Sequence, residues 1–157
     1  MKQLLCIAVF SMLMYCVAFS QTDKGTVLLG GGATFTTSDG TSVFNATPTI
    51  GFFVLNDVVI GAGFDWYTTK GASSWALGPF IRLYLFGNDR GKFIVQSGVN
   101  VGGAKNSDTA FGFDVAAGYA AFLNESIALE LLAGYTKTGD TKGIFSLGAG
   151  FQIHYNR

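Results

Sequence analysis

The sequence predicts an all-β fold, an eight-stranded antiparallel up-and-down β-barrel that follows a cleavable N-terminal signal peptide. After residue 20, apolar and polar side chains alternate with a period of two through eight segments of about a dozen residues, as in strands with two different faces. Clusters of Gly, Asn, Asp, Ser and Thr separate these segments, as turns do. No uninterrupted apolar run in this region is long enough to indicate a transmembrane helix.

The composition limits the classes of protein to which the chain can belong. The 157 residues suffice for one domain, and 49% of them are hydrophobic while only 13% are charged, which excludes a disordered chain. Ten Lys and Arg balance ten Asp and Glu, so the chain lacks the basic surplus of nucleic-acid-binding proteins. We therefore expect no nucleic acid among its partners.

The first residues have the pattern of a secretory signal peptide. Lys2 gives a positive start, an apolar run follows, and Ala18 and Ser20 are small residues of the kind that precede a cleavage site. Cleavage is predicted between Ser20 and Gln21. The predicted domains are then a signal peptide, 1–20, and a barrel domain, 21–157.

Two other interpretations of this segment stay open. One is a retained N-terminal anchor, although the apolar run is shorter than the roughly 20 residues of a spanning helix. The other is lipid attachment at Cys16, where Tyr15 stands at a position that usually holds a small residue. Cys6 and Cys16 are the only cysteines, so a cleaved chain has no thiol for a disulfide or a thiolate metal site.

Eight strands are predicted in the remaining chain, and polar residues mark one face of each. Asp65 in the third strand stands between a Phe and a Trp, and Arg82 in the fourth between an Ile and a Leu. In the seventh strand Glu130 stands between two leucines, and in the eighth Gln152 stands between a Phe and an Ile. The predicted ranges are 25–36, 43–54, 57–68, 74–86, 92–103, 109–122, 126–137 and 143–155.

The two faces differ in charge and in glycine content. The first is apolar and is expected to carry no charge, whereas thirteen of the 22 glycines fall on the second. A soluble barrel turns its bulky apolar face inward. Here the glycine-rich polar face suits a narrow lumen and the apolar face suits lipid, so we predict a transmembrane barrel. The predicted polar network of its lumen comprises Asp65, Arg82, Gln96, Asn100, Asp114, Glu130, Gln152 and His154.

Large aromatic residues are expected on both faces. In the lumen they would fill an interior barely wide enough for side chains. The predicted lumen residues are Phe53, Tyr67, Phe80, Tyr84, Phe86 and Phe122. On the outward face, aromatic residues favour strand ends, as in the girdles at a membrane interface. The predicted interface residues are Phe35, Phe44, Trp66, Trp75, Phe111, Tyr135 and Phe145 at one rim, with Phe93 and Tyr155 toward the other.

The number of strands and the positions of the turns predict how the barrel is oriented in the membrane. An even number of strands places both chain ends on one side of the membrane, normally the periplasmic side. The loops on the opposite side are short and polar, which argues against a receptor or adhesin because binding surfaces usually lie on long loops. The turns expected on the periplasmic side are 56–57, 87–91 and 124–125, and the opposite loops are 37–42, 69–73, 104–108 and 138–142.

Several segments resemble those of one family. They are the signal ending 18–21, the opening strand segment 25–31, and the segments 48–54, 78–84 and 150–155. In these the chain is similar to the small outer-membrane β-barrel domain proteins of Bacteroidetes-type bacteria. The resemblance implies a location in the bacterial outer membrane, contact with its lipid and folding by the barrel-assembly machinery. It also implies that Gly150, Ile153 and Tyr155 form the assembly signal that this machinery reads.

We expect a non-enzymatic protein with a structural or envelope-interaction role and a closed polar lumen, with no cofactor and no metal. The lumen charges are interpreted as packing, and proton or ion passage is the alternative. One rival is a secreted or periplasmic lipocalin-like calyx for an apolar ligand, which needs the bulky face inside. The other is a lipid A-modifying enzyme that uses His154 and Ser146, although eight residues of extended strand separate them by roughly 26 Å. Other envelope partners stay open.

Overall fold

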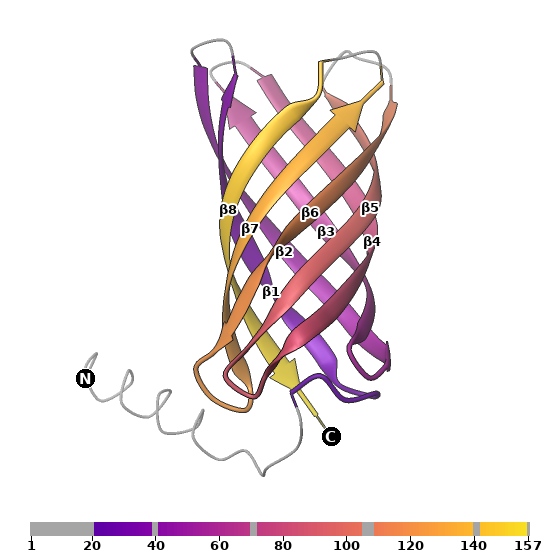
Figure 1. Ribbon diagram of the computed structural model, residues 1–157. Coiled ribbons are helices and arrows are strands. Elements are labelled where there is room, and N and C mark those ends of the chain that lie inside the picture. The colour runs from indigo at the N-terminus through magenta and orange to yellow at the C-terminus, as the bar shows by residue number, and fades with distance from the viewer. Residues whose placement is uncertain (1–20, 39–40, 70–71, 105–108, 140–141, 157) are drawn as a thin grey trace, which may run out of the picture.

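Eight strands form a closed antiparallel barrel (Figure 1). The computed structural model describes residues 21–38, 41–69, 72–104, 109–139 and 142–156. Each strand pairs with its neighbours in chain order, and β1 pairs with β8 to close the barrel. The predicted fold class is therefore confirmed, whereas the predicted signal peptide lies outside the described residues. The strands are β1 (Val27–Ser38), β2 (Thr41–Leu55), β3 (Val58–Thr69), β4 (Ala72–Asn88), β5 (Gly91–Ala104), β6 (Ala110–Phe122), β7 (Ile127–Thr138) and β8 (Ile144–Tyr155).

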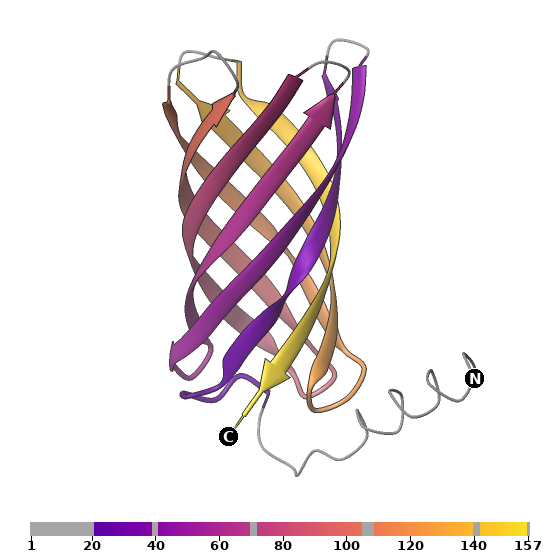
Figure 2. The same cartoon turned by 180° about the vertical axis from the view of Figure 1, so that it is seen from behind.

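The two ends of the described chain, at residues 21 and 156, lie at one end of the barrel, which we call the lower end (Figures 1 and 2). Short connections at 56–57, 89–90 and 123–126 join the strands there, as predicted. Every strand boundary lies within two residues of its predicted position. β1 begins later than predicted because Gly25 has a positive φ of 97° and belongs to a turn, in which the Thr26 N–H donates to the Asp23 carbonyl. In the described part of the chain, no helix has both the length and the apolar character needed to cross a membrane.

The bulky apolar face points outward and the polar face points inward. Ile81, Val95 and Leu129 are 47%, 41% and 47% exposed, whereas Arg82 and Glu130 are 2% and 1% exposed. This is the predicted sidedness, and it is opposite to that of a calyx with an apolar interior. The lipocalin-like alternative is therefore wrong for this chain.

Two residues depart from the predicted faces. Phe86, predicted in the lumen, is 73% exposed on the outside, where its ring lies 5.2 Å from that of Phe93. The cause is a β-bulge between Tyr84 and Gly87, which inserts one extra β4 residue against β5 and reverses the facing of the following side chain. Among the described residues, Lys137 is an exception to the charge-free outer face, because it continues that face at the upper end of β7 and is exposed.

The lower half of the barrel interior is a packed apolar core. Phe53, Tyr84 and Phe122 are buried there, and Phe80 is buried above them, as predicted for large lumen residues. The side chain of Tyr67, also predicted in the lumen, lies outside the described part of the structure. Smaller buried residues complete the core, namely Leu28, Val59, Ile94, Ala120 and Ala128.

Glycine on the inner face makes room for these side chains, and Gly61 is the clearest case. A Cβ atom at Gly61 would lie 2.5 Å from the Ile50 carbonyl oxygen and 2.5 Å from Cζ of Phe80. At Gly78, which also faces the lumen, the nearest atom would be the Val99 carbonyl oxygen at 3.5 Å.

We expect Gly61→Ala to lower the free energy of unfolding by about 1–3 kcal/mol through overpacking. Gly78→Ala is the matched control and should be neutral or slightly stabilising, because Ala is better suited to a strand than Gly. Urea titration of both variants in lipid vesicles measures the difference. Equal stabilities for the two would contradict the close packing at Gly61.

Candidate functional site

His154 occupies the centre of the lower core. The rings of Phe53, Tyr84 and Phe122 lie around its imidazole, with centroid distances of 5.6, 5.9 and 5.4 Å. Its Nδ1 lies 2.5 Å from the Gln21 carbonyl oxygen, which accepts the hydrogen bond. A ring enclosed by aromatic side chains and tied to the backbone is held in one orientation, so His154 is positioned as a packing residue.

The first described residues, Gln21–Thr26, form a strap across the lower opening. The Gln21 side-chain Nε2 donates to the Asn124 backbone carbonyl at 3.3 Å, and the Thr22 carbonyl accepts from the Asp57 N–H at 2.8 Å. Lys92 Nζ donates to the Thr22 hydroxyl at 2.7 Å and forms a salt bridge with Asp57 at 2.6 Å. These contacts join the β2–β3 turn, the β6–β7 turn and β5, so the strap and the aromatic core together fill the lower end.

A buried ion pair lies directly above the core. Arg82 Nη1 donates to both carboxylate oxygens of Glu130 at 2.8 and 3.0 Å. The Arg82 Nε and Nη2 atoms donate to Oε1 of the Gln96 side chain at 2.9 and 2.8 Å, and Gln152 Nε2 donates to Glu130 at 3.3 Å. Tyr84 adds a hydroxyl that donates to Glu130 at 3.3 Å. The group joins β4, β5, β7 and β8 across the lumen, and its charges neutralise each other, as buried charges must.

The upper half of the lumen is hollow. A cavity of about 620 Å³ extends from the Arg82–Glu130 pair toward the upper strand ends. It exists because small residues such as Gly78, Ala116 and Gly148 line it. The expectation that side chains fill the lumen is therefore right for the lower half and wrong for the upper half.

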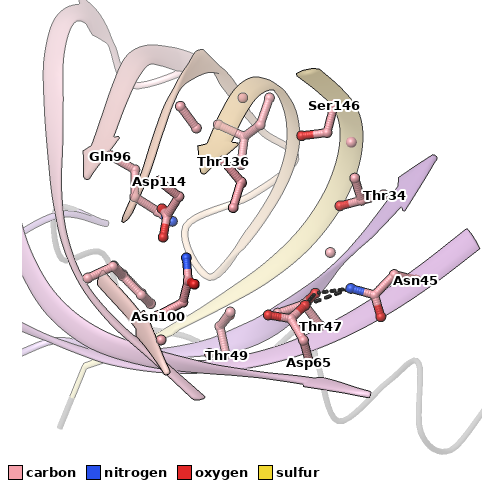
Figure 3. A pocket seen from close by; sticks show the side chains of 18 of the residues that line it. Thr34, Asn45, Thr47, Thr49, Asp65, Gln96, Asn100, Asp114, Thr136 and Ser146 are labelled. Carbon is pink, nitrogen blue, oxygen red and sulfur yellow. Dashed lines mark hydrogen bonds between the residues drawn. The ribbon is translucent and has the colours of Figure 1, made fainter. Parts of the chain in front are cut away.

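Asp65 projects into this cavity from β3 (Figure 3). One of its oxygens accepts a hydrogen bond from Asn45 Nδ2 at 2.6 Å and another from the Thr47 hydroxyl. Both partners come from the neighbouring strand β2, and Asn45 Nδ2 also donates to Thr47 at 3.1 Å. These donors hold the carboxylate in a fixed orientation.

A second carboxylate, that of Asp114, lies across the cavity from Asp65, next to Asn100 (Figure 3). Gly98 on β5 makes room for it, because a Cβ atom at Gly98 would lie 2.8 Å from Asp114 Oδ1. Asn100 also accepts from the Thr138 hydroxyl at 3.4 Å. No ion pair to Asp65 or Asp114 forms among the residues that the structure describes.

The eight polar lumen residues expected to form one network therefore fall into four groups. Arg82, Glu130, Gln96 and Gln152 come together at mid-height. Asp65 is separate from them, Asn100 and Asp114 lie on the opposite wall, and His154 lies at the lower end. Side chains at different heights in a barrel lumen are too far apart to contact one another, so the polar residues form separate groups rather than one network.

Four further polar residues in the lumen or at its lower opening are not among the predicted site residues. Asn45 and Thr47 carry no charge to mark them as site residues, although the alternation 45, 47, 49 in β2 places them on the inner face beside Asp65. Lys92 stands at a strand end and Asp57 in a turn, where periodicity indicates no face.

Predicted rim aromatics lie on the outer face. Trp66, Trp75, Phe111 and Phe145 are exposed, and Tyr135 is partly buried with its ring 5.0 Å from that of Phe145. Phe93 and Tyr119 stack edge to face at 5.3 Å on the outside near the lower rim. The predicted interface residues Phe35 and Phe44 pair in the β1–β2 ladder, but their side chains lie outside the described part of the structure.

The residues predicted as an assembly signal lie on the closing strand. Gly150 faces the lumen beside Glu130, Ile153 is partly buried, and Tyr155 is exposed at the lower end of β8. The β8 strand is complete in the barrel, with ladders to both β1 and β7. Recognition of these residues by the barrel-assembly machinery stays a prediction.

The structure does not bring together Ser146 and His154, the two residues of the predicted enzyme alternative. Ser146 lines the upper cavity, whereas His154 is enclosed at the opposite end of β8, so the two do not meet. Within the described ranges, no three His, Cys, Asp or Glu side chains are grouped closely enough to hold a metal ion. The geometry suits packing at the lower end and solute binding in the upper cavity.

Comparisons with solved structures show the fold. The N-terminal β-barrel domain of Pseudomonas aeruginosa OprF matches with a TM-score of 0.71 at 13% identity, over 84% of this chain and 98% of that one. Neisserial surface protein A matches with a TM-score of 0.64 at 15% identity, over 83% and 96%. The outer membrane enzyme PagL matches with a TM-score of 0.50 at 17% identity, over 82% and 98%.

No family model and no curated protein matches the chain. The Bacteroidetes-type resemblance therefore stays a prediction. At these identities the matches show the fold alone: the chain has the eight-stranded barrel fold of small outer-membrane proteins of Gram-negative bacteria.

Proposed function

We propose that the protein is an outer-membrane barrel that acts without catalysing a reaction, as a structural or envelope-interaction component in contact with outer-membrane lipid. The observation that carries the proposal is the outward apolar face. Large apolar side chains are exposed on the outer face of the described strands. In water such a surface would cause aggregation, whereas in lipid it is stable.

The height of this face fits a bilayer. Trp75 and Phe86 lie on the outside of β4 and are eleven residues apart. That separation is about 36 Å along a strand, and about 28 Å along the barrel axis at a tilt of about 40°. The hydrocarbon core of a bilayer is about 30 Å thick, so the aromatic residues lie where interface girdles are found.

The non-enzymatic role is supported by the surroundings of His154. A general base needs a free nitrogen within hydrogen-bond reach of a nucleophile. Nδ1 is bound to the Gln21 carbonyl, and Nε2 has no hydrogen-bond partner among the described residues. Nε2 is nevertheless buried with the ring among aromatic side chains, and Ser146 lies in the upper cavity, so no nucleophile of the described chain is within its reach. PagL has the same fold, yet in this chain the residues that suggested an enzyme are kept apart.

Export and assembly belong to the same proposal. Residues 1–20 would direct secretion and be removed after Ser20, and the closing strand with Gly150, Ile153 and Tyr155 would be read by the barrel-assembly machinery. In the lower opening, the Gln21 contacts to Asn124 and His154 use its side chain and its carbonyl, so neither contact uses the amino group that cleavage would create.

Outer-membrane isolation followed by gel electrophoresis with and without boiling tests the proposal. We expect the protein in the outer-membrane fraction, with a compact band in the unboiled sample that changes mobility after boiling, because a closed barrel resists detergent until it is heated. Recovery in the soluble periplasm, or a single mobility in both samples, would contradict the proposed membrane barrel.

A further inference from the structure

We propose that the upper cavity binds an organic polycation of the polyamine class. The cavity lining that the structure describes carries four charged side chains, Asp65, Asp114, Glu130 and Arg82. Arg82 and Glu130 neutralise each other at the cavity floor, with a distance of 2.8 Å between Nη1 and Oε1. Two carboxylates on opposite walls are left without a cationic partner among the described residues, so the described lining carries a net negative charge.

The position of these carboxylates favours an elongated ligand with more than one positive charge. Asp65 comes from β3 and Asp114 from β6, and they face each other across the cavity (Figure 3). A ligand with two separated ammonium groups reaches both, whereas a small metal ion would need ligands grouped around one point. No such group of three or more ligands exists within the described ranges.

The lining also supplies hydrogen-bond acceptors. Asn45 Oδ1 and Thr49 Oγ1 are buried in the cavity wall, and neither has a hydrogen-bond partner in the described structure. Asn45 is only 6% exposed, and its amide nitrogen is already used by Asp65 and Thr47. Unsatisfied buried polar atoms are unfavourable, and an ammonium group with three N–H donors is suited to satisfy them.

The volume fits an organic molecule. About 620 Å³ lies within the range of small-molecule sites, which is roughly 300–1,000 Å³. The lower end is filled by the aromatic core and the strap, whereas the cavity reaches Thr34 and Thr138 at the upper strand ends. A ligand would therefore enter from the upper side.

Titration calorimetry of the full chain folded in non-ionic detergent, with spermidine as the probe, tests this inference. We expect saturable binding that weakens as salt is added, about tenfold weaker binding in each of Asp65→Asn and Asp114→Asn, and none detectable in the double variant. Asp89→Asn is the matched control, since it removes an exposed carboxylate in the β4–β5 turn at the opposite end, and it should bind as the unmodified chain does. Butylamine and 1,4-butanediol should bind much more weakly.

Gly78→Leu gives an independent test that leaves every charge in place. The side chain would project into the cavity from a position where a Cβ atom meets nothing nearer than 3.5 Å, and it should reduce spermidine binding by occupying the space. Heat-modifiable mobility shows whether each variant is folded. Absence of binding to the unmodified barrel, equal binding by the folded double variant or by folded Gly78→Leu, or equal binding of 1,4-butanediol would overturn the proposal.

Discussion

Leu131→Arg should greatly impair insertion of the barrel into bilayers. Leu131 lies near the middle of β7 and is 64% exposed on the outer face. An Arg near the bilayer midplane of a barrel costs about 2–4 kcal/mol, because the guanidinium must be dehydrated or must draw water and headgroups into the membrane. The free energy of unfolding from lipid vesicles, measured by urea titration, should fall by about this amount.

Leu131→Asn is the control for loss of the leucine side chain alone. It removes the same apolar contact with lipid but introduces no charge, so its effect should be clearly smaller than that of Arg. Equal stability of the two variants in vesicles would mean that residue 131 is hydrated rather than in contact with hydrocarbon. The same pair in detergent micelles should differ less, because a micelle adapts its shape around a charge.

Arg82→Leu should produce the other large effect. Removing the guanidinium leaves Glu130, which is 1% exposed, without its cation, and breaking a buried pair in this way costs about 3–5 kcal/mol. The Gln96 amide would lose its two donors at the same time. We expect a fall of this size in the free energy of unfolding.

The double variant Arg82→Leu/Glu130→Leu distinguishes the effect of leaving one buried charge unpaired from the effect of losing the arginine side chain itself. With both charges gone, no ion is left buried, and most of the stability should return. Arg90→Leu, in the exposed β4–β5 turn, should change stability by less than about 0.5 kcal/mol. If Arg82→Leu proves as mild as Arg90→Leu, the ion pair does not hold the walls of the lumen together.

The fold was predictable because a barrel wall has only two faces. A period of two assigns each strand residue either to the lipid-facing side or to the lumen. Arg82 and Glu130 alternate with aliphatic neighbours, and this alternation was sufficient to predict that the polar face points inward. The bulge that turns Phe86 outward was not predictable in this way. The bulge depends on how β4 and β5 are aligned with each other, and the residue pattern of a single strand gives no information about that alignment.

The candidate site was less predictable than the fold. Periodicity indicates which residues face the lumen but not their heights, so Asp65 and His154 were expected to join the Arg82 network although they lie above and below it. The cavity was also missed. Glycine on the inner face indicates space, but only the structure shows that bulky side chains fill that space at Phe53 and leave it empty near Gly78.

The most direct measurement of the central claim compares spin labels at Ala116 and Ala117. These adjacent small residues of β6 face opposite ways: Ala116 lines the cavity and Ala117 is exposed outside. With Cys6 and Cys16 replaced by Ser, each position is changed to Cys, labelled and placed in bilayers. The label at 117 should collide frequently with oxygen, which concentrates in hydrocarbon, and rarely with a water-soluble nickel complex, whereas the label at 116 should show much less contact with oxygen. The reverse order, or equal oxygen accessibility at both positions, would contradict an apolar face in lipid around a polar lumen.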